Sequence, residues 1–469
     1  MSRRVNRRQF LARTAVVVFG GALAACADEE PTDAMGADAG GDTGAGGDAG
    51  GVDTGGADSG ATDAGGTDAG STDTGGSDGG NDTGVDAGPV GIDAASLSKG
   101  PWTYVIGADV ILAFETRADI AAEVVITRPD GEQQTVTTER STESVPVMWP
   151  PVEGILADYP DVPGDYTVHE VRIPGAATTG GTWTWSLATT DGPREGRFVV
   201  PEGDRVRLAW FADTMLPMSE QVAPIVIVSD ADVYLHGGDI QYQSNPIDTW
   251  NGYFAIFGAA MAKGPTHHAV GNHEYEEQDE YANHYVRLFG AQGDEGSPAD
   301  YHAFTWGSVR FIVMNSEEDF GQEGDQLEWL RTELQNASAA NGIAHIVVAF
   351  HRPFVTFAKA HPNREKRDVI HPLLVEYGVS MVLTGHNHCY ERFIVDGITY
   401  IVDGGGGAGT YDPNDHLPDV EANWPEELEW RQTWARTHGA LVVDFYADGR
   451  IEGVRTDIAG QETDAFTVG

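Results

Sequence analysis

The sequence predicts an α/β fold with mixed β-sheets, preceded by a separate all-β sandwich. Three observations predict it. Short alternating strand patterns fill the region from about residue 100 to residue 201. After residue 201, apolar strand patterns alternate with helical patterns. Fourteen of the fifteen histidines also follow residue 201, so a metal site is expected in the second region.

The first 26 residues resemble an export signal. RRQFL (7–11) precedes an apolar run that is too short to span a bilayer. Paired arginines ahead of Phe-Leu are typical of twin-arginine export, and LAAC (23–26) resembles the lipobox of bacterial lipoproteins. We therefore expect lipidation of Cys26 to hold the protein on a bacterial cell envelope, with an ordinary secretory signal as the alternative. Cys389, the other cysteine, is expected to be a packed apolar thiol.

Residues 27–98 consist mainly of Gly, Ala, Asp, Thr and Ser, with an aspartate at every fifth position from Asp48 to Asp78. Such a segment has little apolar surface to bury, which predicts a disordered tether. Calcium binding by the repeats is the alternative, but the large apolar residue that such repeats need is absent. The whole chain carries a formal charge of −45, so nucleic acid and anionic lipid surfaces are not expected partners.

Residues 99–201 are expected to form the β-sandwich, a structural or docking module. They contain one histidine, His169, and no cluster of metal ligands. The clearest strand patterns are 109–117, 122–129, 166–174 and 182–190.

Residues 203–469 are expected to carry the chemistry. A helix is predicted over 325–337, because leucines recur there on one helical face. Buried strands are predicted at 205–213, 231–239, 345–351 and 379–386, and each ends in a polar residue. Ligands bind at the carboxyl ends of strands in such folds. The strand-end residues that could bind metal are Asp213, Asp239, Asn272, His351, His386 and His388.

Each of these residues alone is a weak signal, because a strand-end aspartate is commonly a turn or cap and a lone histidine is commonly structural. Their order in one chain is more specific. GD (238–239), GNHE (271–274), a later histidine and GHNH (385–388) resemble the motifs of the calcineurin-like metallophosphoesterase superfamily. The resemblance covers about residues 203–469 and implies a four-layer sandwich with mixed sheets.

The first motif of that superfamily is usually D-x-H, but here Asp213 is followed by Thr214 and Met215. GDIQY (238–242) resembles the GDxxY motif of purple acid phosphatases, in which the tyrosine binds ferric iron and the D-x-H histidine is also absent. Tyr242 would thus replace the missing ligand. That family usually has glycine in place of Met215, so this side chain is expected to affect access to the first metal.

Two further segments support the resemblance. GHNHCYER (385–392) is similar to a run in purple acid phosphatases, and residues 100–117 resemble the start of the fibronectin-III-like sandwich that precedes the plant enzymes. The resemblance implies a binuclear centre with Fe³⁺ at the first site and Fe²⁺, Zn²⁺ or Mn²⁺ at the second. The first metal would be bound by Asp213, Asp239, Tyr242 and His388, and the second by Asp239, Asn272, His351 and His386.

The resemblance also implies the reaction. Hydroxide generated at the centre would attack the phosphorus of a small phosphate ester, with the two cations stabilising the attacking and leaving oxygens. His273 would protonate the leaving group. His361, ten residues after His351, would contact the substrate; an exposed loop residue is the alternative.

The remaining aromatic and imidazole side chains give no decisive signal. His267, His268 and His284 are expected at the surface, with a place at the mouth of the site as the alternative. Trp424, Trp430 and Trp434 could wall the site or simply pack. Phosphomonoester hydrolysis is the leading hypothesis for function. A phosphodiesterase or nucleotidase and a non-catalytic surface-binding protein are the alternatives. The sequence does not predict the oligomeric state.

Overall fold

The computed structural model describes residues 91–145, 164–242, 246–275, 282–294, 296–318, 324–360 and 362–469. The export signal and most of the tether lie outside these ranges. Residues 91–98, which the composition assigns to the tether, instead contain η1 (Ala94–Ser96) and the start of β1. Ile92 is only 4% exposed and joins the core of the sandwich, so ordered structure begins earlier than the composition indicates.

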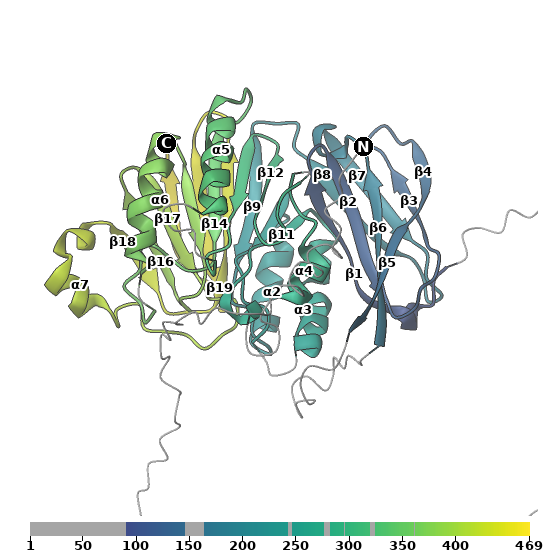
Figure 1. Cartoon of the computed structure of the whole chain (residues 1–469), viewed down its shortest axis with the longest axis horizontal. Coiled ribbons are helices and arrows are strands. Elements are labelled where there is room, and N and C mark those ends of the chain that lie inside the picture. The colour runs from purple at the N-terminus through teal and green to yellow at the C-terminus, as the bar shows by residue number, and fades with distance from the viewer. Residues whose placement is uncertain are drawn as a thin grey trace, which may run out of the picture. The chain divides into compact units, whose positions relative to one another are not determined.

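The first region consists of two four-stranded antiparallel sheets, in the orders β1-β2-β6-β5 and β4-β3-β7-β8 (Figure 1). Alternation in β7 places Trp183, Trp185 and Leu187 in the core. The strands are β1 (Leu97–Ile106), β2 (Asp109–Thr116), β3 (Glu123–Thr127), β4 (Gln133–Thr137), β5 (Glu139–Val145), β6 (Gly164–Ile173), β7 (Gly181–Leu187) and β8 (Arg194–Val200), with η3 (Ala176–Thr178) after β6. The likeness to fibronectin III stays a prediction.

The second region contains two mixed sheets, in the orders β11-β10-β9-β19-β20-β21 and β12-β13-β14-β15-β17-β16-β18. In the first, β9, β10 and β11 are parallel, and in the second β13, β14, β15 and β17 are parallel. The strands are β9 (Arg205–Phe211), β10 (Val233–His236), β11 (Thr266–His268), β12 (His302–Trp306), β13 (Val309–Val313), β14 (His345–Phe350), β15 (Met381–Thr384), β16 (Tyr390–Val395), β17 (Ile398–Asp403), β18 (Arg431–Ala435), β19 (Gly439–Tyr446), β20 (Ile451–Asp457) and β21 (Glu462–Val468).

Helices cover the outer face of each sheet. Val222 and Phe257 pack with Phe211 on the first sheet, while Leu330 and Leu334 pack on the second. The inner faces of both sheets contribute to one further cluster. The mixed-sheet α/β prediction is therefore confirmed. The helices are α2 (Ser219–Val228), α3 (Pro246–Met261), η4 (Asn272–Tyr275), α4 (Asn283–Phe289), α5 (Asp325–Ala339), α6 (Arg364–Glu376), α7 (Leu417–Asn423) and η5 (Pro425–Glu429).

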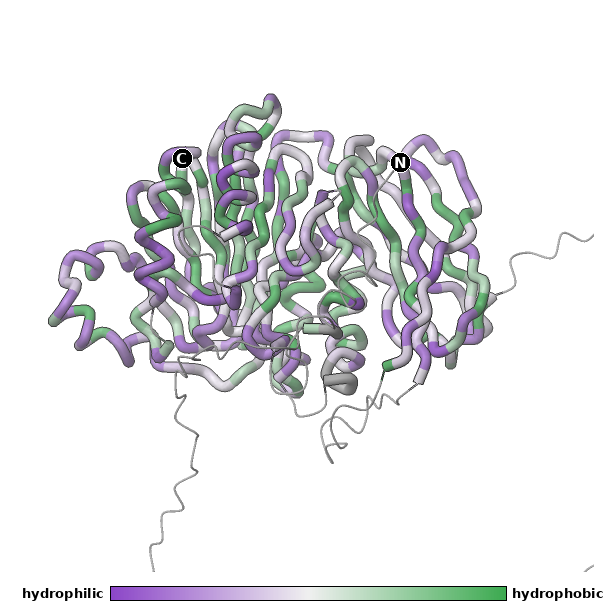
Figure 2. Tube along the Cα trace, in the orientation of Figure 1, coloured by the Kyte–Doolittle hydropathy of each residue, from purple (hydrophilic) through white to green (hydrophobic). Residues whose placement is uncertain are grey.

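Most of the parallel strands are apolar, because both of their faces are covered. Every residue of β10, β14, β15 and β17 is buried, and hydrophobic residues follow the strands in Figure 2. Within the described ranges, no helix is long and apolar enough to cross a membrane.

Strand β1 also contacts the second region. The Val105 N–H donates to His267 Nε2 (3.1 Å), and the Val105 carbonyl accepts from Gly293 N (2.9 Å). Nearby, the buried Glu115 carboxylate binds Lys99 Nζ (2.8 Å) and the Arg287 guanidinium. Backbone hydrogen bonds and a buried ion cluster thus join the two regions.

Candidate metal centre

Parallel strands bring the predicted ligands to one edge of each sheet. Asp213 follows β9 by two residues and Asp239 follows β10 by three. His351 comes directly after β14, and His386 follows β15 by two residues. The carboxyl ends of neighbouring parallel strands lie together, which is where ligands bind in α/β sheets.

Three of these residues have strained backbones. Asp213, Asp239 and His386 have φ angles of 61°, 61° and 66°, in the left-handed region that is uncommon for residues other than glycine. Hydrogen bonds hold them there: Asp213 N donates to Gly238 O (3.0 Å), and His386 N donates to Asp213 Oδ2 (2.9 Å). Such conformations persist only where the surroundings determine them, and they concentrate at functional sites.

Tyr242 lies among the residues predicted for the first metal. Its Oη is 2.7 Å from Asp213 Oδ1, 3.2 Å from Asp239 Oδ2 and 2.9 Å from His388 Nε2. Burial raises the pKa of Tyr242 well above its usual value, and the negative charges of Asp213 and Asp239 raise it further. A tyrosinate therefore needs a neighbouring cation to form here.

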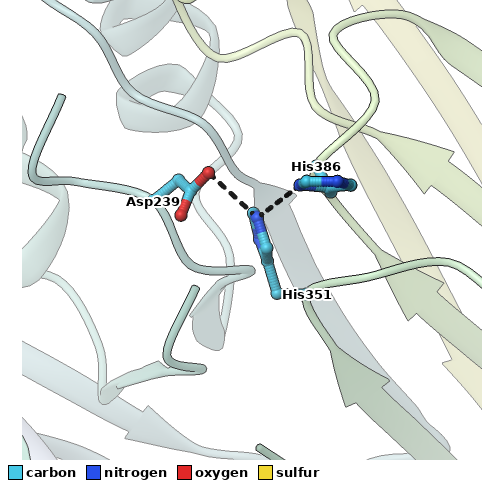
Figure 3. Close-up of side chains that lie close together, drawn as sticks. All are labelled: Asp239, His351 and His386. Carbon is cyan, nitrogen blue, oxygen red and sulfur yellow. Dashed lines mark hydrogen bonds and ion pairs between the residues drawn. The ribbon is translucent and has the colours of Figure 1, made fainter. Parts of the chain in front are cut away.

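A second group consists of Asp239, His351 and His386, whose candidate ligand atoms all lie within 4.8 Å of one another (Figure 3). Asp239 Oδ2 is 2.9 Å from His351 Nε2, which is 3.2 Å from His386 Nδ1. Burial alone would lower the pKa of His351, but Asp239 raises it to about 10. Asp239 Oδ2 is shared between this group and that around Tyr242.

Hydrogen bonds fix which ring nitrogens face the centre. His351 Nδ1 lies 2.9 Å from Gly237 O, and His388 Nδ1 lies 2.8 Å from Gly409 O. A carbonyl only accepts, so each Nδ1 carries a proton, and each Nε2 is the atom that would bind a metal ion. His386 is reversed: its Nδ1 faces the centre and its Nε2 lies 3.0 Å from Arg352 Nη1.

The GNHE motif forms η4 against Asp239. His273 N donates to Asp239 Oδ1 (2.9 Å), while His273 Nε2 is 3.8 Å from Asp239 Oδ2. The His273 ring lies 4.2 Å from that of Tyr242, centroid to centroid. Asn272 Oδ1 is buried and has no hydrogen-bond partner among the described residues. His361 lies outside the described residues, so its predicted role stays a prediction.

Glu274 is a residue of the candidate site that the sequence did not single out. Its buried carboxylate accepts hydrogen bonds from the backbone N–H groups of four residues, Asp239, Ile240, Gln241 and Gly271, at 2.7–3.2 Å. Burial and the nearby Asp239 raise the pKa of Glu274 to about 7. Its position as the last residue of the GNHE motif is the feature of the sequence that could have identified it. Glu274 ties the loop that carries Asp239 to the loop that carries Asn272.

Two glycines allow this close packing. A Cβ on Gly271 would come within 2.2 Å of Asp239 Oδ1, and one on Gly238 would come within 2.9 Å of His351 Nδ1. Gly238 also has a φ of 93°, a conformation that glycine adopts without strain. Met215 is half-buried, and its N–H donates to Asp213 O (3.2 Å) in the same turn.

The structure corrects the expectation that His267, His268 and His284 lie at the surface, because all three are buried. His267 Nδ1 lies 3.1 Å from His302 Nε2. His268 lies 3.0 Å from the Tyr253 hydroxyl. His267 and His268 belong to β11, where the His268 ring stacks on Phe289 of α4, and His284 belongs to α4 itself.

Two of the three tryptophans in the C-terminal segment are packed, and the third is exposed. Trp424 and Trp430 pack against the α5–α6 cluster, with the Arg364 guanidinium 3.7 Å from the Trp424 ring centroid. Trp434 is 46% exposed. Cys389 is buried and free, as predicted.

Comparisons with known proteins agree with this geometry. A family model described as calcineurin-like phosphoesterase matches residues 208–390. Purple acid phosphatase 22 of Arabidopsis thaliana is 27% identical over 199 residues, which are 41% of this chain and 44% of that protein. A relative from the same plant, named probable inactive purple acid phosphatase 9, is 29% identical over 34% of this chain and 29% of its own length. The chain thus spans less than half of the length of these relatives.

A solved purple acid phosphatase from yellow lupin (Lupinus luteus) seeds has a similar fold. The TM-score is 0.62 at 17% sequence identity, covering 80% of this chain and 74% of that chain. The chain therefore contains a calcineurin-like metallophosphoesterase domain, with purple acid phosphatases among its relatives.

Proposed function

We propose that the chain hydrolyses small phosphomonoesters at a binuclear metal centre, as the resemblance to purple acid phosphatases implies. The observation that carries the proposal is the sharing of Asp239 Oδ2 between two groups of ligand-type atoms. One group contains Tyr242 and His388, and the other contains His351 and His386.

The residues present fit two metal ions. Carboxylate, imidazole and phenol groups converge at the centre. Among the described residues, the Asp213 and Asp239 carboxylates form ion pairs with histidines and with no lysine or arginine. Asn272 Oδ1, a suitable amide ligand, has no hydrogen-bond partner in the part of the chain that the structure describes. A buried polar atom without a partner is costly, and a metal at the second site would satisfy it. The phenolate of Tyr242 would suit Fe³⁺ at the first site, with Fe²⁺, Zn²⁺ or Mn²⁺ at the second.

Metal ions bound there would supply positive charge for the phosphoryl oxygens and acidify a water molecule. Side chains of the protein would position the metal sites and the reacting groups. Asp239 would hold both sites together, and Glu274 would fix the loops that carry the ligands. His273 would protonate the leaving oxygen, since its ring is partly exposed beside Tyr242.

The test combines metal analysis, a visible absorption spectrum and turnover by the purified chain from residue 91 onward. We expect about two metals per chain, one of them iron, a charge-transfer band and hydrolysis of p-nitrophenyl phosphate. A preparation reconstituted with iron and zinc that binds neither metal would contradict the proposal. Faster turnover of bis(p-nitrophenyl) phosphate than of the monoester would favour the phosphodiesterase alternative.

The envelope location is a separate proposal that rests on the sequence of residues 1–26. Replacing Cys26 by alanine should move the protein from the membrane fraction to the soluble fraction of the cell envelope. An unchanged distribution would contradict lipidation.

A further inference from the structure

Arg352 lies beside the candidate centre and has no role in the proposed function. It follows His351 directly, and its side chain is 36% exposed. Its Nε donates to both Glu317 oxygens (2.9 and 3.0 Å), and its backbone N–H donates to Ser316 Oγ (2.9 Å). The Arg352 backbone and Nε are therefore held in place, while Nη1 lies 3.0 Å from His386 Nε2.

The contact between Arg352 and His386 is incompatible with a metal ion on His386. A guanidinium only donates hydrogen bonds, so the 3.0 Å contact from Nη1 makes His386 Nε2 the acceptor. His386 Nδ1, which lies 3.2 Å from His351 Nε2, is the atom that faces the centre. A metal ligand needs a lone pair on that Nδ1, which places the proton on Nε2 instead. Two donors would then face each other, and the contact with Arg352 would break.

Glu317 determines where the freed group can go. Glu317 binds Nε, so a small turn of the whole planar guanidinium, with the Glu317 side chain following, would move Nη1 off His386 and keep the group beside the centre. Both terminal nitrogens would then be available within reach of the centre. Arginine binds phosphate oxygens with two parallel N–H donors. In a chain with a net charge of −45, such a cation would offset the repulsion between the acidic surface and an anionic substrate.

We propose that Arg352 is a substrate-binding residue, which leaves His386 when the centre takes up metal and then binds the phosphate group of the ester. The inference rests on the proposed function for the nature of the substrate. It assigns to Arg352 a contact that is made equally to substrate and transition state, so the effect belongs mainly in KM.

The test compares Arg352→Met and Arg352→Lys with the wild-type chain. For Arg352→Met we expect KM for p-nitrophenyl phosphate to rise at least tenfold while kcat changes less than threefold. The affinity of the metal-loaded protein for inorganic phosphate, measured by calorimetry, should fall at least tenfold. Arg352→Lys should recover part of both losses, because it keeps the charge without the two parallel donors.

Arg205→Met is the matched control. Arg205 begins β9, is 42% exposed and pairs with Asp444 at 3.7 Å, so the variant removes the same charge away from the centre. It should keep wild-type KM and phosphate affinity. An equal loss in Arg205→Met would assign the effect to overall charge and overturn the inference.

Zinc titration of the metal-free protein gives a readout that does not depend on turnover. Arg352→Met should bind zinc at least as tightly as the wild type, because no donor then competes for His386 Nε2. Weaker zinc binding with unchanged phosphate affinity of the loaded sites would make Arg352 a structural residue and overturn the inference.

The two proposals can fail separately. A wild-type chain that binds metal and inorganic phosphate but hydrolyses no phosphomonoester would contradict the proposed function. The inference about Arg352 would still be supported if Arg352→Met lost phosphate affinity. Equal phosphate affinity in the wild-type chain and in Arg352→Met would overturn the inference, whether or not either protein hydrolyses phosphomonoesters.

Discussion

Two groups of buried histidines in this molecule have opposite surroundings. In the structural group, His267 accepts a hydrogen bond from Val105 N, and His268 is bound by the Tyr253 hydroxyl and the Gln292 amide. In the candidate centre, His351 faces a carboxylate on one side and the His386 ring on the other. The structural rings have complementary protein partners, whereas the rings of the centre converge on one another.

The difference also shows in the pKa values. Burial lowers the pKa of His267 and His268 well below the usual value and lowers that of His302 to about 3. At His351 burial acts in the same direction, but Asp239 raises the pKa to about 10. Burial also lowers the pKa of His386, which faces His351, well below the usual value, so the raised pKa marks the ring in direct contact with the shared carboxylate.

The largest effect is expected from Asp239→Asn, which removes the carboxylate shared by both ligand groups. Metal ions contribute several kcal/mol to such reactions, and 1.36 kcal/mol corresponds to a tenfold change in rate. We therefore expect kcat/KM to fall by at least about 1,000-fold, with metal content well below that of the wild type. Asp294→Asn, which removes the same charge at an ion pair with Arg310, should keep both. Full metal content in Asp239→Asn would contradict the shared role.

Tyr242→Phe removes the phenol from the centre and keeps the ring. We expect loss of the visible band and a fall in kcat of about 100-fold, as for other single groups that stabilise charge in a transition state. Tyr253→Phe is the matched change in the structural group, and its spectrum should match that of the wild type. A band that survives in Tyr242→Phe would exclude this tyrosine as the coloured ligand.

His267→Leu tests the structural group. The change leaves Val105 N and His302 Nε2 without their partner, and each unsatisfied buried group costs about 1–3 kcal/mol. The free energy of unfolding measured in urea should fall by about 2–4 kcal/mol, while the metal content of the folded protein stays at the wild-type value. Loss of metal together with unchanged stability would reverse the assignment of the two groups.

The smallest expected effect is on the pH dependence of stability. His302 has a folded-state pKa of about 3, below its usual value of 6.5, so between these values the unfolded chain binds a proton that the native chain does not. The contribution of His302 to the free energy of unfolding is therefore fully present above pH 6.5 and is lost as the pH falls. From pH 7.5 to 5.5 the loss is about 1.4 kcal/mol for one such histidine. In urea unfolding at these two pH values, His302→Gln should lose stability less steeply than the wild type; equal losses would contradict a neutral His302.

Much of the fold and of the centre follows from sequence pattern. The strands before Asp213, Asp239 and His351 are continuous apolar runs that need cover on both faces, and polar residues at their ends mark the ligand edge. Glu274 and Arg352 were not identified, because their partners are backbone groups or side chains from distant loops.

The expectation for His267 and His268 was wrong for a related reason. Imidazoles are commonly exposed, and a short strand of three residues has no pattern that reveals its burial. The pairing of β11 beside β10, the contact from β1 and the stacking of Phe304 and Phe289 on the two rings enclose them.

The left-handed backbones of Asp213, Asp239 and His386 have a consequence for the evolution of this chain. Each such conformation costs about 1–3 kcal/mol, and glycine would relieve that cost at any of the three positions. The substitutions that most easily stabilise these turns therefore remove a side chain from the centre. Selection for thermal stability alone would lead toward a more stable fold that lacks the centre.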